Sequence, residues 1–252
     1  MPSGKFYHKQ SGRWLSKETK QAFDYGSVDP DSSAFLISFF RWYPDYFLDI
    51  IEDENADFTL QFPQRLILRA FARYETAYIT GPRGIGKTYL VWLSCLIDGV
   101  LFPGEVVRYY APSQKQAAEL AATAFHQIEK NYPALAACWS IKSETKDTFK
   151  VISSYGSEIS IGATQGGNCS QLVAEEIGQE TDPKFDFNDI ETMAIPTARN
   201  IRSVAKMKDP VHINNKIKII TNASTRVNRA YTGHHKKTNR EMMFEKAGIV
   251  IV

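Results

Sequence analysis

The sequence predicts an α/β fold in which a mostly parallel central sheet is flanked by helices. Two observations support this: short β-type runs alternate with helical patterns along most of the chain, and a glycine-rich turn joins one such run directly to an apolar helix. The chain has 252 residues and is 43% hydrophobic, which suits one sizeable domain with a small appendage. We expect residues 1–57 to form an N-terminal arm and helical extension, and residues 58–252 the α/β domain.

The expected elements follow from local patterns of apolar, branched and turn-forming residues. Residues 1 to about 30 are polar and turn-rich, so we expect a poorly ordered arm there. Helices are expected over 32–51, with a break at Pro44, and over 62–73, 89–97 and 114–130, the last capped by Ser113. Strands are expected over 77–80, 106–111, 148–153, 158–162, 171–174, 216–221 and 248–252.

Composition excludes several classes of protein. Net charge is only +2, so a surface for nucleic acid would have to be a local patch. The three cysteines form neither a C-x-x-C pair nor a zinc spacing, which favours a reducing compartment. No apolar run approaches the roughly 20 residues that a membrane span needs, and the N-terminus has no secretory signal. We therefore expect a soluble protein without a membrane partner.

Residues 81–88 fit G-x-x-x-x-G-K-[ST], the phosphate-binding loop of P-loop NTPases. The glycines let the backbone approach a ligand closely, and its N–H groups form an anion-binding nest. Lys87 is expected to reach the β- and γ-phosphates of ATP, and the Thr88 hydroxyl to ligate Mg²⁺. A chance glycine-rich turn is the alternative, but both flanks match the motif. The residues expected to contact the nucleotide are Gly81, Pro82, Arg83, Gly84, Ile85, Gly86, Lys87, Thr88 and Tyr89.

A second candidate segment places two carboxylates after an apolar strand. Residues 172–174 are followed by Glu175 and Glu176, the Walker B pattern. We expect Glu175 to hold Mg²⁺ and Glu176 to polarise the attacking water as general base. Asp is usual at the first position, so the extra methylene of Glu175 changes the geometry of the metal site. The alternative is a solvated acidic helix start.

Two further segments are candidates for the same site. The apolar run before Thr221 ends in a small polar tetrad, whose first two residues would hydrogen-bond the γ-phosphate or the lytic water; a capped turn is an equal alternative. The tetrad, a candidate coupling segment, is Thr221, Asn222, Ala223 and Ser224. Gln64 lies 17 positions before Gly81, and its amide can read the edge of adenine. The alternative for Gln64 is an exposed residue at a helix start.

In this order, the segments resemble the ATPase domain of a phage large terminase subunit, the DNA-packaging motor. The resemblance runs from about Phe62 to Ser224 and rests on residues 62–65, 81–88, 109–117, 175–176 and 221–224, of which only 81–88 is specific alone. It implies a P-loop NTPase of the ASCE (RecA-like/terminase) type, with ATP and Mg²⁺ as cofactors. The implied activity is ATP hydrolysis coupled to translocation of double-stranded DNA into a procapsid.

The resemblance also implies partners and further site residues. Arg83 matches an arginine that responds to the γ-phosphate, which makes Arg83, Lys87 and Glu176 the candidate catalytic residues. The implied partners are a phage portal protein, a small terminase subunit and further copies in a homo-oligomeric ring, in the cytoplasm of the infected host cell. Full-length family members also carry a nuclease domain, which we expect to be absent because the chain ends at Val252.

Cations are expected in two roles. The chain has no arginine between Tyr109 and Ala198, so a cation acting on a neighbouring subunit's site would be a lysine or a later arginine. The candidates are Lys142, Lys146, Lys150, Arg199, Arg202, Arg226 and Arg229. A basic stretch after the coupling segment predicts contact with the DNA backbone, with a solvated loop as the alternative. Its candidate residues are Arg226, Arg229, Lys236, Lys237 and Arg240.

Two other functions stay open at this point. A superfamily-2 helicase fragment also places a glutamine before its P-loop, but helicases need a second RecA-like domain. A nucleotide-binding switch or assembly module with little turnover is compatible with Glu175 in place of Asp.

Overall fold

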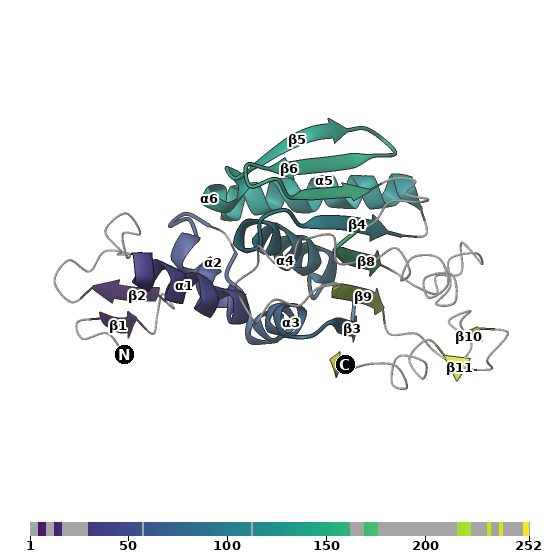
Figure 1. The fold of residues 1–252 in the computed structure, drawn as a ribbon. Coiled ribbons are helices and arrows are strands. Elements are labelled where there is room, and N and C mark those ends of the chain that lie inside the picture. The colour runs from purple at the N-terminus through teal and green to yellow at the C-terminus, as the bar shows by residue number, and fades with distance from the viewer. Residues whose placement is uncertain are drawn as a thin grey trace.

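The computed structural model describes residues 5–8, 13–16, 30–56, 58–111, 113–161, 169–175, 216–222, 231–232, 237–238 and 249–251. At the centre lies an eight-stranded sheet in the order β12-β3-β9-β8-β4-β7-β6-β5 (Figure 1). Neighbouring strands are parallel from β12 to β7, and β6 and β5 are antiparallel. The predicted α/β fold with a mostly parallel sheet is confirmed. The strands are β3 Thr76–Gly81, β4 Val106–Tyr110, β5 Trp139–Glu144, β6 Phe149–Ser153, β7 Glu158–Ile161, β8 Gln171–Glu175, β9 Lys216–Asn222 and β12 Ile249–Ile251.

The described helices begin where the sequence supplies a start signal. Proline occupies an N-terminal position of α2, α3 and α6, where its missing N–H is tolerated. Ser113 caps α5, because its hydroxyl accepts a hydrogen bond from the backbone N–H of Gln116. The helices are α1 Pro30–Trp42, α2 Pro44–Ile51, α3 Phe62–Arg73, α4 Lys87–Leu101, α5 Gln114–Asn131 and α6 Pro133–Ala136. None of these described helices is long and apolar enough to cross a membrane.

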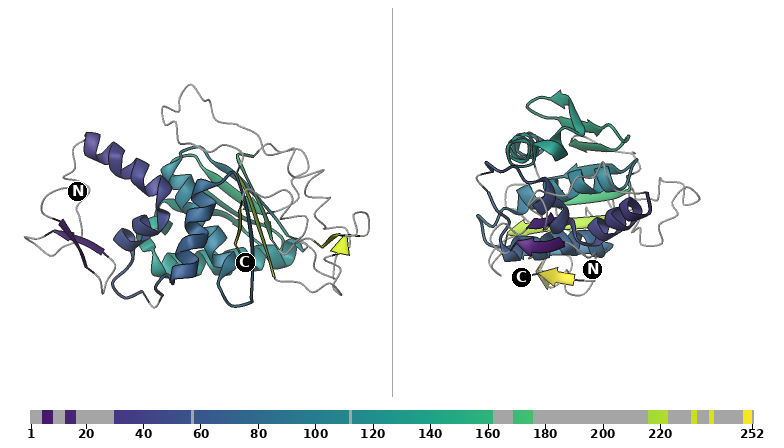
Figure 2. Two further views of the ribbon diagram at one scale, coloured as in Figure 1. Left: turned by 90° about the horizontal axis from the view of Figure 1, so that it is seen from below. Right: turned by 90° about the vertical axis from the view of Figure 1, so that its left-hand side faces the viewer.

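The core lies between the sheet and the helices packed on it (Figures 1 and 2). Every residue of β8 is buried, as expected for a strand inside a parallel sheet. Helix α4 is buried along most of its length, and its Trp92 packs edge-on against Phe149 of β6, with ring centroids 5.5 Å apart. This all-round burial places α4 firmly beneath the strands that carry the candidate site.

Helices α1 and α2 share this core. Phe40 of α1 and Leu48 of α2 belong to the same cluster of buried side chains as Leu68 of α3. Two buried aspartates of α2 also bind arginines of α3: Asp49 pairs with Arg65 at 2.6 Å, and Asp45 with Arg69 at 2.7 Å. The helical part of the predicted extension therefore braces α3, the helix that approaches the phosphate-binding loop.

The structure corrects two expectations. The predicted arm contains an antiparallel pair, β1 Lys5–His8 with β2 Arg13–Ser16, whose four-residue alternation is too short to stand out in sequence. Strand β5 was not expected, because the side chains at its centre are exposed and polar except for Ile141. An edge strand of this kind lacks the apolar pattern that predicts buried strands. Two short strands, β10 Tyr231–Thr232 and β11 Lys237–Thr238, also pair antiparallel.

Candidate functional site

The strand order brings three of the predicted segments to one edge of the sheet. Strand β9 lies between β3, which leads into the glycine-rich loop, and β8, which ends in Glu175. Gly81 is in register with Asn222, and Glu175 with Ile220. The carboxyl ends of these three parallel strands therefore meet, which is where α/β folds bind ligands. The coupling segment begins between the loop and the carboxylate, as the sequence predicted.

The loop between β3 and α4 has the backbone of a phosphate cradle. Gly84 and Gly86 have φ angles of +90° and +83°, a left-handed conformation that side chains disfavour. Gly86 is also the N-cap of α4, so the positive end of the helix dipole faces the loop. The Lys87 Nζ donates hydrogen bonds to the carbonyls of Gly81 and Pro82 at 3.0 and 2.8 Å. The ammonium group thus lies over the loop, within reach of a phosphate held there.

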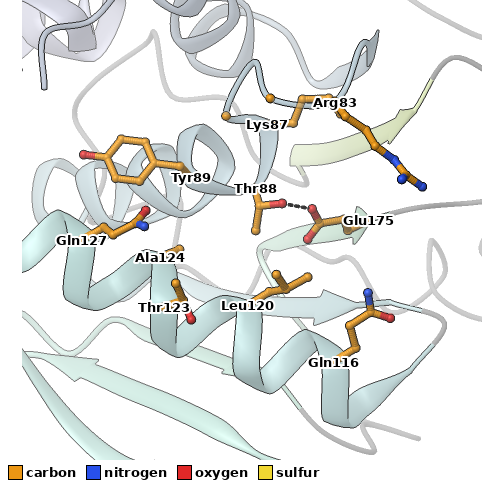
Figure 3. A pocket seen from close by; sticks show the side chains of 12 residues that line it. Arg83, Lys87, Thr88, Tyr89, Gln116, Leu120, Thr123, Ala124, Gln127 and Glu175 are labelled. Carbon is orange, nitrogen blue, oxygen red and sulfur yellow. Dashed lines mark hydrogen bonds between the residues drawn. The ribbon is translucent and has the colours of Figure 1, made fainter.

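Thr88 and Glu175 contact each other directly. The Thr88 hydroxyl, in the first turn of α4, donates a short hydrogen bond to the Glu175 Oε1 at the end of β8 (Figure 3). Glu175 is only 4% exposed. Hydroxyl and carboxylate oxygens are the hard ligands that Mg²⁺ prefers, and this ion usually takes few protein ligands besides water and phosphate oxygens. Among the described residues, no group of three or more His, Cys, Asp or Glu side chains could hold a metal. The donor set fits Mg²⁺ with one hydroxyl and one carboxylate.

A cavity of about 510 Å³ adjoins this pair. One wall is the loop and the start of α4, and the opposite wall is a face of α5 that the sequence did not indicate as part of a site (Figure 3). The spacing of these α5 residues repeats every three or four positions, but a polar helix face is usually solvated, so this signal alone could not reveal them. The α5 residues are Gln116, Leu120, Thr123, Ala124 and Gln127.

Arg83 and Tyr89 lie at different parts of this cavity. Arg83 is exposed, lines the cavity and extends outward on the side of Glu175, whereas Lys87 stays over the loop (Figure 3). Burial raises the pKa of Tyr89 to about 12, and its hydroxyl accepts a hydrogen bond from the Asn131 amide at 3.3 Å. Tyr89 is therefore a neutral, anchored wall, and Arg83 is a free-standing cation at the rim.

Gln64 lies beside the loop, but its amide is already engaged. Its Oε1 accepts a hydrogen bond from the backbone N–H of Gln61 at 2.8 Å, and its Nε2 donates to the carbonyl of Ile85 at 3.1 Å. The side chain is 8% exposed and does not line the cavity of about 510 Å³. The adenine-reading role stays a prediction. The observed role of Gln64 is to tie the first turn of α3 to the phosphate-binding loop.

We expect Gln64→Glu to loosen this loop. The carboxylate retains an acceptor for Gln61 but loses the donor to Ile85, whose carbonyl it would repel. Leaving such a polar group unpaired costs about 1–3 kcal/mol of folding stability. Denaturant unfolding and ATP titration should both show the loss, while Gln114→Glu, at an exposed position of α5, should change neither. Wild-type stability and ATP affinity in Gln64→Glu would show that the contact does not support the loop.

Several predicted residues lie outside the part of the chain that the structure describes, and for two others only the backbone is described. Among the candidate lysines, Lys142 and Lys146 are exposed, whereas Lys150 pairs with Glu158 at 2.9 Å. The backbone of Asn222 lies in β9 and that of Lys237 in β11. The residues outside the described ranges are Glu176, Arg199, Arg202, Ala223, Ser224, Arg226, Arg229, Lys236 and Arg240.

Fold and site together define a P-loop NTPase fold of the ASCE type. The glycine loop joins β3 to α4, a carboxylate ends β8, and one further strand, β9, separates the two. This separation distinguishes the arrangement from folds in which the two strands are neighbours.

Comparison with known proteins finds likeness only at the level of the fold. No family model matches the chain, and no curated protein matches it. The ATPase domain of the Thermus phage P74-26 large terminase has 15% identity and a TM-score of 0.46, over 66% of each chain. A mutant of that domain has 13% identity and a TM-score of 0.44, over 76% of this chain and 89% of that chain. The large terminase of another thermophilic bacteriophage has 11% identity and a TM-score of 0.43, and this chain spans 66% of its own length and 38% of that protein's.

Proposed function

We propose that this chain is an ATP-hydrolysing, Mg²⁺-dependent motor domain that translocates double-stranded DNA during viral genome packaging. The observation that carries the proposal is the contact between Thr88 and Glu175 at the mouth of a glycine-rich phosphate cradle. A hydroxyl and a carboxylate brought together there from α4 and β8 suit a nucleoside triphosphate with its divalent cation.

In this proposal, each residue performs one part of hydrolysis. Lys87 exchanges the carbonyls of Gly81 and Pro82 for the β- and γ-phosphates, and the N–H groups of the loop hold the remaining phosphate oxygens. Thr88 and Glu175 hold Mg²⁺, which neutralises charge that develops on the phosphoryl group. Glu176 orients the attacking water as general base. Catalysis is then positioning and charge stabilisation, without a covalent intermediate.

The motor role rests on the segments around this site. Thr221 lies on β9 between the loop strand and the carboxylate strand, so its position can respond to the γ-phosphate. The basic stretch that follows β9 would contact the DNA backbone without reading sequence. Arg83 would sense the γ-phosphate, and exposed Lys142 or Lys146 would act on a neighbouring subunit in a ring. The proposed partners are DNA, a portal protein and a small terminase subunit in the host cytoplasm.

Phosphate release from ATP, measured with and without Mg²⁺ and with and without double-stranded DNA, tests this function. We expect turnover that requires Mg²⁺ and rises when DNA is added. Tight ATP binding with almost no turnover under all conditions would favour a switch or assembly module instead. Strand displacement by the full gene product would favour a helicase. Failure to bind ATP in the presence of Mg²⁺ would contradict the proposal as a whole.

A further inference from the structure

Three charged side chains are buried beneath the sheet, away from the cavity. Asp98 on α4 is 5% exposed, and Lys216 and Lys218 on β9 are each 1% exposed. Alternate residues of a strand face the same side, so both lysines point at the helix that follows the phosphate-binding loop. The sequence indicated only a strand over these residues.

The contacts converge on one carboxylate. Lys218 Nζ donates to the Asp98 Oδ2 at 2.9 Å and to the Ser94 hydroxyl at 2.8 Å. Lys216 Nζ lies 3.3 Å from both oxygens of Asp98. Gln171 of β8, itself fully buried, donates its amide to the Asp98 Oδ2 at 3.1 Å. We refer to Asp98, Gln171, Lys216 and Lys218 as the Asp98 cluster.

Electrostatics keeps this cluster ionised. Burial works to raise the pKa of Asp98, but the neighbouring ammonium groups of Lys216 and Lys218 lower it to about 2. Aromatic rings also face the lysines, with Phe102 5.3 Å from Lys216 Nζ and Phe71 5.5 Å from Lys218 Nζ. The cluster is therefore a set of charge-assisted hydrogen bonds inside the core at neutral pH.

Stability alone is a weak reason for such a cluster. Removing charges from water is expensive, and well-packed apolar residues at buried ion-pair positions are often as stable or more so. Charge-assisted hydrogen bonds, however, are short and directional, whereas apolar surfaces in contact tolerate small sliding movements. A buried cluster of this kind sets the relative position of the elements that it joins.

The elements joined here are those that carry the candidate site. Asp98 binds β8 and β9 from α4, and the site ends of these three elements hold Glu175, Thr221 and Thr88, respectively. At 1.5 Å per helical residue, Thr88 is about 15 Å from Asp98 along α4. At about 3.3 Å per strand residue, the contacts on β8 and β9 are roughly 10–13 Å from Glu175 and Thr221. One carboxylate thus anchors all three elements behind the site.

We propose that the Asp98 cluster positions the catalytic site: it holds α4 against β8 and β9 so that Thr88, Glu175 and Thr221 keep the spacing that hydrolysis needs. Through the same contacts, a movement of α4 on nucleotide binding passes to β9 and the coupling segment. The residues of the cluster touch neither nucleotide nor metal. This inference rests on the proposed ATPase function and adds to it a means of linking nucleotide state to β9.

An apolar replacement of the whole cluster separates positioning from stability. The variant combines Asp98→Leu, Gln171→Met, Lys216→Met and Lys218→Met, and the Ser94 hydroxyl can bond to its own helix. We expect a folded protein with a thermal midpoint at or above that of the wild type. ATP affinity should change only a few-fold, while turnover should fall roughly tenfold to a hundredfold because the reacting groups are misplaced.

A matched control removes another ion pair from the same sheet. Arg108 of β4 and Glu158 of β7 pair at 2.6 Å but contact none of the three site elements through that bond. Arg108→Met with Glu158→Met should leave kcat unchanged. Wild-type turnover in the folded quadruple variant, or an equal loss in this control, would overturn the positioning role.

Hydrogen–deuterium exchange on the unaltered chain tests the link even if the quadruple variant does not fold. A non-hydrolysable ATP analogue with Mg²⁺ should slow amide exchange in 216–222 as well as in α4. Slower exchange confined to the loop and α4 would overturn the link to β9. If the analogue does not bind the unaltered chain, the proposed function itself fails and this inference fails with it. Normal binding with no response in β9 contradicts only the inference.

Discussion

Lys87→Ala should abolish Mg²⁺-dependent ATP hydrolysis and severely weaken ATP binding. The Lys87 ammonium lies over the loop carbonyls of Gly81 and Pro82 and is the one lysine that lines the cavity in the described part of the chain. Loss of a single preorganised group that stabilises transition-state charge lowers kcat by roughly a hundredfold to a thousandfold. Phosphate release and ATP titration measure the two effects separately.

The control for this variant is Lys115→Ala, at an exposed position on α5 that does not line the cavity. It makes the same change of net charge, so a general electrostatic effect would appear in both variants. We expect Lys115→Ala to retain turnover and affinity. Lys87→Ala with wild-type kcat and ATP affinity would remove the phosphate-binding assignment for residues 81–88.

Glu176→Gln should retain ATP binding and lose turnover. The amide cannot accept a proton from water, and loss of a general base lowers the rate of hydrolysis by roughly a hundredfold to ten-thousandfold. A single-turnover experiment with labelled ATP should recover the nucleotide intact on the protein. Glu176 follows the last described residue of β8, so this experiment assigns a role that the described contacts leave to Glu175 alone.

Glu175→Gln is the matched comparison, because its neighbour contacts Thr88 and its predicted role is metal binding. We expect Glu175→Gln to raise the Mg²⁺ concentration needed for half-maximal turnover, and Glu176→Gln to leave it unchanged. Normal hydrolysis by Glu176→Gln would remove the assignment of the base. A rate loss in Glu175→Gln that excess Mg²⁺ does not restore would transfer the role of base to Glu175.

Local patterns were sufficient to predict most elements. The helix over 62–73 and the buried strands over 171–174 and 216–221 have the expected bounds or differ by one residue, because apolar periodicity and start signals are properties of neighbouring residues. Strand β5 and the pair β1–β2 were missed for the same reason. Their pairing depends on a partner strand, and their own residues give little apolar alternation.

The sequence by itself determined the phosphate-binding loop, since the left-handed backbone at Gly84 and Gly86 depends only on residues that lack a Cβ. Tertiary structure decided which side chains meet at that loop and behind it. Strand order brought Glu175 to Thr88, the approach of α3 engaged Gln64 with Ile85, and α4 placed Asp98 against Lys218. Backbone conformation is set within a few adjacent residues, whereas a side chain's partner depends on how elements far apart in the chain pack.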